Sequence, residues 1–150
     1  MAITVKKAAI EDVSIVALLF DAYRQFYKQP TDVEAAAEFI SARLQNNESV
    51  IFIAFDNEDA VGFTQLYPIF TSVGMKKTWL LNDLYVAATA RGKGAATALL
   101  DAAKELGLAT NSKWLLLETA NDNFNAQKLY EKNNWQKVEQ YCFYTFQLTE

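Results

Sequence analysis

The spacing of apolar residues in the first third of the chain predicts one short strand followed by two helices. Residues 3–7 read as a strand. Apolar side chains then recur at helical spacing, which predicts a helix from residue 11 to about residue 27. The run Thr31-Asp32-Val33-Glu34 has the capping-box pattern and predicts a second helix that ends at Leu44 or Asn46.

The middle of the chain predicts three antiparallel strands. Residues 49–56 are strongly β in character, 57–59 form a turn, and 60–70 read as the returning strand of a hairpin. Pro68 indicates an edge, a bulge or the end of that strand, because proline has no N–H group for a ladder. A third long strand is expected at 77–86.

The pattern then predicts one crossover from a strand through a helix to a parallel strand. A helix that begins after Gly94 is expected to run to Leu106, with Gly107 as its C′ residue. Residues 114–119 form an apolar run, which is typical of a buried parallel strand.

Two further elements complete the chain. Asn123 or Asn125 caps a short helix that reaches residue 132, and 136–148 read as a final β region rich in aromatic side chains. That region would either pair across a dimer or cover the core. Antiparallel strands followed by one βαβ crossover predict the α/β (α+β) class, with a mixed sheet flanked by about four helices. With no linker or repeat, residues 1–150 are expected to form a single domain.

Composition narrows the function mainly by what it lacks. Apolar residues make up 51% of the chain, which allows a core and argues against disorder. The net charge of −4 argues against a nucleic-acid surface. No apolar run is long enough for a membrane span, and the N-terminus lacks a signal-peptide layout. A cytoplasmic protein is expected, with neither nucleic acid nor membrane as a partner.

The chain has no histidine and one cysteine. The absence of histidine excludes Ser-His-Asp and Cys-His catalysis and every metal site with histidine ligands. Cys142 cannot form a disulfide within the chain, and we expect it to be a buried, inert thiol. No metal is therefore predicted, and acid–base chemistry is left to Asp, Glu, Tyr, Lys or water.

The stretch from Arg91 to Leu100 is the main candidate for chemistry. Two glycines flank Lys93 and lead directly into an alanine- and leucine-rich helix. Glycine lets the backbone approach a ligand closely, and the first N–H groups of a helix favour an anion. The stretch therefore reads either as a phosphate cradle or as a glycine turn before an ordinary surface helix.

Three designs of phosphate cradle compete. A P-loop fails because Lys93 lies between the glycines. A dinucleotide fingerprint has Thr97 where its third glycine belongs, and residues 87–91 separate the preceding strand from Gly92, although Glu118 mimics the acid that binds a ribose. The third design is an Arg/Gln-x-x-Gly-x-Gly/Ala signature, which Arg91-x-x-Gly94-x-Ala96 matches.

This signature belongs to the GCN5-related N-acetyltransferase (GNAT) superfamily, which the chain resembles. Residues 80–86 resemble the strand before the signature, and the segment from Asn123 to Trp135 resembles the family's second motif. Within the superfamily, the Hpa2-like group and the diamine and polyamine acetyltransferases are the most similar. The resemblance implies a GNAT fold, acetyl-CoA as co-substrate, direct transfer to a primary amine of a small molecule or lysine-like side chain, and a homodimer.

The resemblance also implies how the chain contacts coenzyme A. Backbone groups of 84–86 would hold the pantetheine arm and the acetyl carbonyl, and the N–H groups of 92–96 would wrap the pyrophosphate. The implied set comprises Leu84, Tyr85, Val86, Arg91, Gly92, Lys93, Gly94, Ala95, Ala96, Thr97, Asn123 and Tyr130.

Tyr130 is the implied catalytic acid, because a phenol near the sulfur can protonate the departing thiolate. Asp83 is the leading candidate for the base that deprotonates the amine, and Glu118 is the second. The polyamine enzymes commonly carry a glutamate directly before that aspartate, where this chain has Asn82. Without the resemblance, Tyr130 reads as a core tyrosine, and the carboxylates read as surface or hydrogen-bonding groups.

The acceptor amine is expected beside the first helix and the third-strand region, which flank that site in the family. The expected lining residues are Tyr23, Tyr27, Gln65, Tyr67, Asn82 and Glu118. Two other functions stay open: an acyl-CoA-binding sensor without catalysis, and a nucleotide-binding α/β protein.

Overall fold

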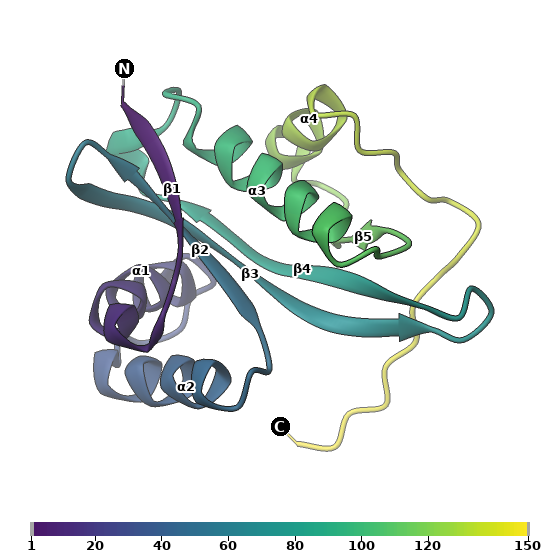
Figure 1. Cartoon of the computed structure of the whole chain (residues 1–150), viewed down its shortest axis with the longest axis horizontal. Helices are drawn as coiled ribbons and strands as arrows, with labels where there is room; N and C mark the ends of the chain where they lie inside the picture. Colours follow the sequence, from purple (N-terminus) through teal and green to yellow (C-terminus); the bar gives the residue numbers. More distant parts are fainter. Residues whose placement is uncertain (1, 150) are drawn as a thin grey trace. The chain divides into compact units, whose positions relative to one another are not determined.

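Alternating side chains in the strands build one sheet that carries helices on both faces (Figure 1). The computed structural model describes residues 2–149, which fall into two compact units divided after Glu118; each is described by itself. The first unit contains β1 (Ile3–Lys7), η1 (Ile10–Asp12), α1 (Val13–Phe26), α2 (Val33–Gln45), β2 (Val50–Asp56), β3 (Asp59–Thr71), β4 (Lys76–Val86), η2 (Ala88–Ala90), α3 (Ala95–Ala109) and β5 (Leu115–Leu116). The second contains α4 (Phe124–Lys132).

The five strands lie in the order β1-β2-β3-β4-β5. The first three pairings are antiparallel, and β4 pairs with β5 in parallel. Together with the four α-helices, this mixed sheet confirms the predicted α/β class. No helix in residues 2–149 is both long enough and apolar enough to cross a bilayer.

Two apolar cores lie on opposite faces of the sheet because successive strand residues point in opposite directions. Ile51, Ile53 and Phe63 pack with buried residues of α1 and α2 on one face. Ala54 packs with Leu99 of α3 on the other face. Pro68 lies in the part of β3 beyond Leu66, where the pairing with β2 has ended, so the expectation of an edge position is confirmed.

A buried carboxylate joins α1 to the start of α2. Asp21 is 3% exposed, and it accepts hydrogen bonds from the Asp32 N–H and the Thr31 hydroxyl, both at 2.7 Å. These bonds, the Asp32 N–H first, hold the pKa of Asp21 below its ordinary value. The predicted capping box is therefore wrong in detail: Asp32 is the N-cap, and it accepts from the Ala35 N–H at 3.0 Å.

The crossover differs from the prediction in two places, the end of its helix and the extent of its second strand. Helix α3 runs past Gly107 to Ala109. Gly107 is buried, and a Cβ added there would lie 3.2 Å from the Leu115 side chain. The parallel strand is only Leu115–Leu116, and Trp114 is 46% exposed. The strand is short because β5 pairs with β4 at only two positions.

The final β region at 136–148 is also wrong. Residues 136–149 form neither strand nor helix, and Cys142 is exposed instead of buried. An alternating aromatic pattern reports β-propensity, but a strand forms only where another strand edge pairs with it.

Candidate active site

The candidate site is built around a β-bulge in β4. Gln65 pairs with Asp83, whereas the next residue, Leu66, pairs with Leu81, so Asn82 is the extra residue. The bulge leaves Asn82 exposed and turns the Asp83 side chain inward, where it is 3% exposed.

Beyond the bulge, one edge of β4 is open. The ladder with β5 covers only Trp79 and Leu80, whereas β4 continues to Val86. Within the described part of the chain, residues 84–86 therefore have no strand partner on the β5 side. An open edge presents backbone N–H and C=O groups that an extended ligand can pair with.

A chain of hydrogen bonds fixes the Asp83 carboxylate. Gln65 Nε2 donates to one carboxylate oxygen, and Asn82 Nδ2 donates to the other at 2.9 Å. The Gln65 amide is itself oriented by Ser49, whose hydroxyl donates to Gln65 Oε1 at 2.8 Å. Thr64 donates its hydroxyl to the Asp83 carbonyl, also at 2.8 Å. Gln65 is wholly buried, so it positions Asp83 and does not itself face an acceptor.

Burial shifts the titration of two groups in this network. It raises the pKa of Asp83 above its ordinary value, while hydrogen bonds from Gln65, Asn82 and Tyr23 act in the opposite direction. Burial, followed by the negative charge of Asp83, raises the pKa of Tyr67 to about 12. Tyr67 therefore stays protonated at neutral pH, and Asp83 is the better candidate for a base.

Aromatic rings border the carboxylate. The Tyr23 hydroxyl donates to the Asn82 carbonyl at 3.4 Å, and its ring centroid lies 5.1 Å from Tyr27 and 6.4 Å from Tyr85. The structure thus brings five of the six predicted acceptor-site residues to one region. The sixth, Glu118, is exposed at the end of the first unit.

Ser49 and Thr64 also belong to this network, and neither was predicted from the sequence. A signal for Thr64 was present, because Thr64-Gln65 interrupts an otherwise apolar strand, and polar side chains inside such a strand need partners. Ser49 precedes its strand and carried no comparable signal.

The glycine stretch has the backbone of a cradle. Gly92 and Gly94 adopt φ of 83° and 87°, and a Cβ at either position would have no atom within 4 Å. Gly94 is the N-cap of α3, and its carbonyl accepts the helix's first bond, from Ala98 N–H at 3.0 Å. The N–H groups of Ala95 and Ala96 therefore have no partner inside the helix. These features fit a phosphate group.

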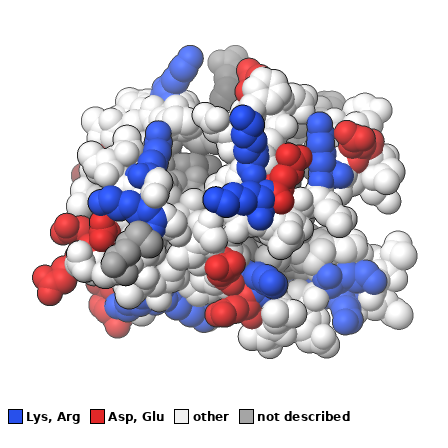
Figure 2. Space-filling view, turned by 90° about the horizontal axis from the view of Figure 1, so that it is seen from above, with Lys and Arg blue, Asp and Glu red and all other residues white. Residues whose placement is uncertain are grey.

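The two cations of the stretch are already engaged. Arg91 Nε donates to the Val86 carbonyl at 3.3 Å, and Lys93 Nζ forms an ion pair with Asp56 at 3.1 Å. Figure 2 shows basic and acidic side chains interspersed on the face it presents, with no single region of one sign. Backbone N–H groups are therefore expected to contribute more to anion binding here than the side-chain charges of Arg91 and Lys93 do.

Gly94→Ala should weaken binding of a phosphate-bearing ligand mainly through backbone strain. A left-handed conformation costs a residue with a Cβ about 1–2 kcal/mol, and the structure leaves space for the methyl group itself. Gly94→Asn is the matched control, because asparagine tolerates this conformation better. Calorimetry with coenzyme A should give the smallest dissociation constant for the wild type, a larger one for Gly94→Asn and the largest for Gly94→Ala. Equal dissociation constants for Gly94→Ala and the wild type would contradict the role of this stretch in binding a phosphate.

Asn123 and Tyr130 lie in the second unit. Asn123 is the N-cap of α4, and its side chain accepts from the Ala126 N–H at 3.2 Å, so this alternative of the two predicted caps is confirmed. Tyr130 is partly buried, and its ring centroid lies 6.2 Å from that of Trp135. The predicted catalytic and cofactor roles of both residues stay predictions.

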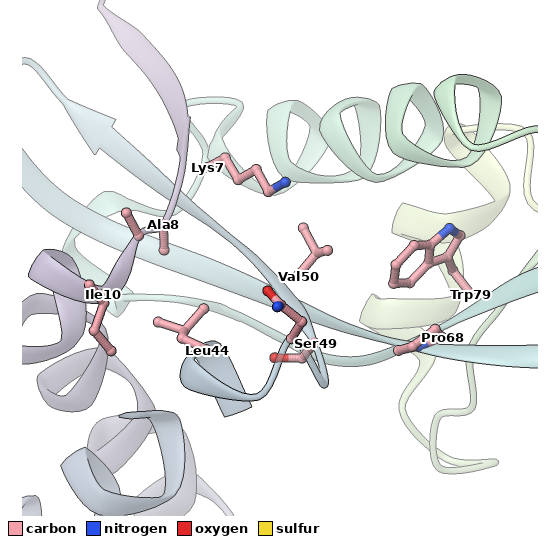
Figure 3. A pocket seen from close by; sticks show the side chains of 10 residues that line it. Lys7, Ala8, Ile10, Leu44, Ser49, Val50, Pro68 and Trp79 are labelled. Atoms are coloured by element: carbon pink, nitrogen blue, oxygen red, sulfur yellow. The ribbon is translucent and has the colours of Figure 1, made fainter. Parts of the chain in front are cut away.

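A separate pocket of about 230 Å³ lies near the start of β2 (Figure 3). Its lining includes Lys7, Leu44, Ser49 and Trp79, and none of the residues predicted for the cofactor or the acceptor. It meets the Asp83 network only through Ser49.

Comparisons with known proteins agree with this arrangement. The acetyltransferase (GNAT) family model matches residues 14–135. The uncharacterized N-acetyltransferase YhfO of Bacillus subtilis is 44% identical over 140 residues, which cover 93% of this chain and 94% of that protein. A probable acetyltransferase of Haemophilus influenzae is 35% identical over 120 residues, covering 79% and 82%.

A solved structure extends the likeness to three dimensions. The crystal structure of a probable acetyltransferase, 37% identical in sequence, superposes with a TM-score of 0.92 and covers 98% of this chain and 99% of that one. The chain is an N-acetyltransferase that belongs to the acetyltransferase (GNAT) family.

Proposed function

We propose that this protein uses acetyl-CoA and transfers its acetyl group directly to a primary amine of a small molecule or a lysine-like side chain. The observation that carries the proposal is the open edge of β4. This edge begins beside buried Asp83 and leads towards the glycine cradle at Gly92–Gly94. An extended ligand with a phosphate at one end and a reactive carbonyl at the other fits such a track.

The residues on this track fit coenzyme A. Residues 84–86 would pair with the pantetheine arm, and the N–H groups of 92–96 would hold the pyrophosphate. When bound, acetyl-CoA supplies a thioester carbonyl that an unprotonated amine can attack. GNAT proteins generally use this co-substrate, which supports the same choice.

Asp83 is proposed to take the proton that the amine loses. Burial raises the pKa of its carboxyl, which makes it a stronger base than an exposed aspartate. Because Asp83 is only 3% exposed, the proton is expected to travel through one water beside Asn82. The tyrosine rings at Tyr23 and Tyr27, together with the Asp83 charge, would attract an amine in its cationic form before deprotonation. Glu118 remains the second candidate for the base.

Tyr130 is proposed to give its phenolic proton to the sulfur as the carbon–sulfur bond breaks. Tyr130→Phe should lower kcat by roughly 10²–10⁴-fold, the usual contribution of a general acid, and leave the dissociation constant of acetyl-CoA nearly unchanged. Steady-state kinetics and calorimetry measure the two quantities separately. An unchanged kcat would remove this role, and the phenol would then be a packing residue next to Trp135.

Titration calorimetry with acetyl-CoA, NAD and ATP tests the proposed co-substrate. We expect acetyl-CoA to release heat on binding and coenzyme A to compete with it. NAD and ATP should neither release heat nor compete. Binding of NAD or ATP in preference to acetyl-CoA would favour a nucleotide-binding protein instead. Membership of the Hpa2-like group and a cytoplasmic location stay predictions.

A further inference from the structure

The pocket near the start of β2 is built into a notch of the sheet. The ladder of β1 with β2 ends at Lys7, the ladder of β3 with β2 ends at Leu66, and Pro68 lies beyond that end. The last turn of α2 adds Leu44 to the wall. The volume of about 230 Å³ would hold roughly seven waters at about 30 Å³ each, so the pocket has room for a small molecule.

The lining carries one cationic side chain. Figure 3 shows the Lys7 ammonium extending from the end of β1 into the space above the start of β2. The carboxylates closest to this lining along the chain already have cations. Asp12 forms an ion pair with Lys6 at 3.0 Å, and Glu48 forms one with Arg43 at 2.9 Å. Lys7 is therefore the charge that a ligand in the pocket meets, and it favours an anion.

Most of the remaining wall is apolar and rigid. The Trp79 ring is 5% exposed, and its Nε1 donates to the Thr110 hydroxyl at 2.9 Å, which fixes its orientation. Pro68 has no N–H group, so the open edge of β3 offers no full ladder to an added strand at this point. The apolar lining residues are Ala8, Ala9, Ile10, Leu44, Val50, Pro68 and Trp79. A compact apolar ligand with one negative charge, such as a small aromatic carboxylate, fits this combination.

Ser49 connects the pocket to the candidate active site. It lines the pocket, and its hydroxyl donates to Gln65 Oε1 at 2.8 Å. Gln65 in turn donates to the Asp83 carboxylate. All three side chains are buried, at 8%, 0% and 3% exposure, so water does not readily replace either bond. An anion that accepts the Ser49 proton removes the bond that orients the Gln65 amide.

We propose that this pocket is an effector site for a small aromatic carboxylate, which pairs with Lys7, accepts the Ser49 hydroxyl and thereby loosens the hold of Gln65 on Asp83. The binding site stands on the pocket alone. Its effect on the rate rests on the proposed function, in which Asp83 is the base. The ligand then lowers acetyl transfer without entering the cofactor or acceptor site.

Calorimetry on the full chain with benzoate as the probe tests the binding site. We expect a dissociation constant of roughly millimolar or below, and much weaker binding of benzamide, which has the same shape without the charge. Lys7→Met should weaken benzoate binding at least about tenfold, because it keeps the apolar stem and removes the cation. Lys6→Met is the matched control on the same strand, and it should leave the affinity unchanged, since Lys6 pairs with Asp12.

Nuclear magnetic resonance tests the connection to Asp83 without any assay of activity. The side-chain amide signal of Gln65, identified by its loss in Gln65→Glu, should shift when benzoate binds to the wild type. The shift should disappear in Ser49→Ala and return in Ser49→Thr, which restores the hydroxyl. With an amine that the protein acetylates, saturating benzoate should lower kcat about fivefold or more and leave the dissociation constant of acetyl-CoA unchanged.

Four results would overturn the proposal. Absence of benzoate binding, or equal binding to the wild type and Lys7→Met, would remove the site. Competition between benzoate and acetyl-CoA would place the ligand in the cofactor site instead. An unchanged Gln65 signal with benzoate bound would separate the pocket from Asp83. If the protein acetylates no amine, the proposed function fails, while calorimetry and the Gln65 signal still decide whether the pocket binds and what it contacts.

Discussion

Asp83→Asn is expected to lower kcat by roughly 10²–10⁴-fold, the usual contribution of general acid–base catalysis, while acetyl-CoA binds as before. The change keeps the size of the side chain but removes the group proposed to take the proton from the amine. Activity of the wild type should also fall as pH drops through the raised pKa of Asp83, because only the ionised carboxylate can act as base. Steady-state rates across a pH series, with cofactor affinity from calorimetry, check both statements.

The same variant is expected to differ from the wild type in how its stability depends on pH. Because burial raises the pKa of Asp83, the folded chain binds its proton more tightly than the unfolded chain does. The stability of the wild type therefore falls as pH rises through that pKa, and asparagine avoids this loss. The Tm of Asp83→Asn relative to that of the wild type should therefore rise as pH increases through the folded pKa, and this relative gain should vanish in acid.

Asp21→Asn is the matched control, since Asp21 and Asp83 are both 3% exposed. Hydrogen bonds lower the pKa of Asp21, so its contribution to stability is present at neutral pH and is lost as pH falls through the folded pKa. Asp21→Asn should therefore lower Tm at neutral pH and leave the chemistry unchanged. Asp83→Asn with unchanged kcat, or with the same dependence of Tm on pH as the wild type, would contradict the role assigned to Asp83.

Gly62→Ala is expected to lower the free energy of unfolding by roughly 1–3 kcal/mol, the usual cost of overpacking. Gly62 pairs with Val86 across β3 and β4, and an added Cβ would lie 2.6 Å from the Tyr85 carbonyl oxygen. A backbone atom cannot rotate away, so β4 itself must shift. Because Tyr85 belongs to the strand proposed to hold the pantetheine arm, acetyl-CoA affinity should fall as well.

Gly74→Ala is the control for this substitution. A Cβ at Gly74 would lie 3.0 Å from the side chains of Lys113 and Thr71, which can adjust. Denaturant unfolding should show a small change for Gly74→Ala and a large one for Gly62→Ala. If Gly62→Ala lowers stability but leaves acetyl-CoA affinity normal, the position of β4 does not determine how tightly acetyl-CoA binds.

Elements whose signals are local could be predicted from the sequence. The first strand, the first helix, the hairpin and the Asn123 cap depend on spacing and capping within a few residues. Gly107 was misassigned because a buried glycine beside Leu115 and a C′ glycine look alike in sequence. The length of β5 and the fate of 136–148 depend on which strand edges are available, and a sequence pattern does not contain that information.

In the candidate site too, features set by local sequence could be predicted, and features that depend on contacts between distant residues could not. Motif spacing was enough to name the glycine stretch, and the resemblance to the family added Asp83 and Gln65. The bulge at Asn82, which turns Asp83 inward, arises from the pairing of β3 with β4 and so appears only in the structure. Ser49 was missed because its role depends on a contact with Gln65, 16 residues away along the chain.

Acetyl transfer itself is the decisive measurement. The protein is incubated with acetyl-CoA and one amine at a time from a panel of diamines, polyamines, lysine-like amino acids, aminoglycosides and peptides, while free thiol and acetylated amine are both quantified. We predict thiol release that depends on the amine and equals the acetylated product in amount. Tight binding of acetyl-CoA without thiol release for any amine in the panel would contradict catalysis and would favour an acyl-CoA sensor.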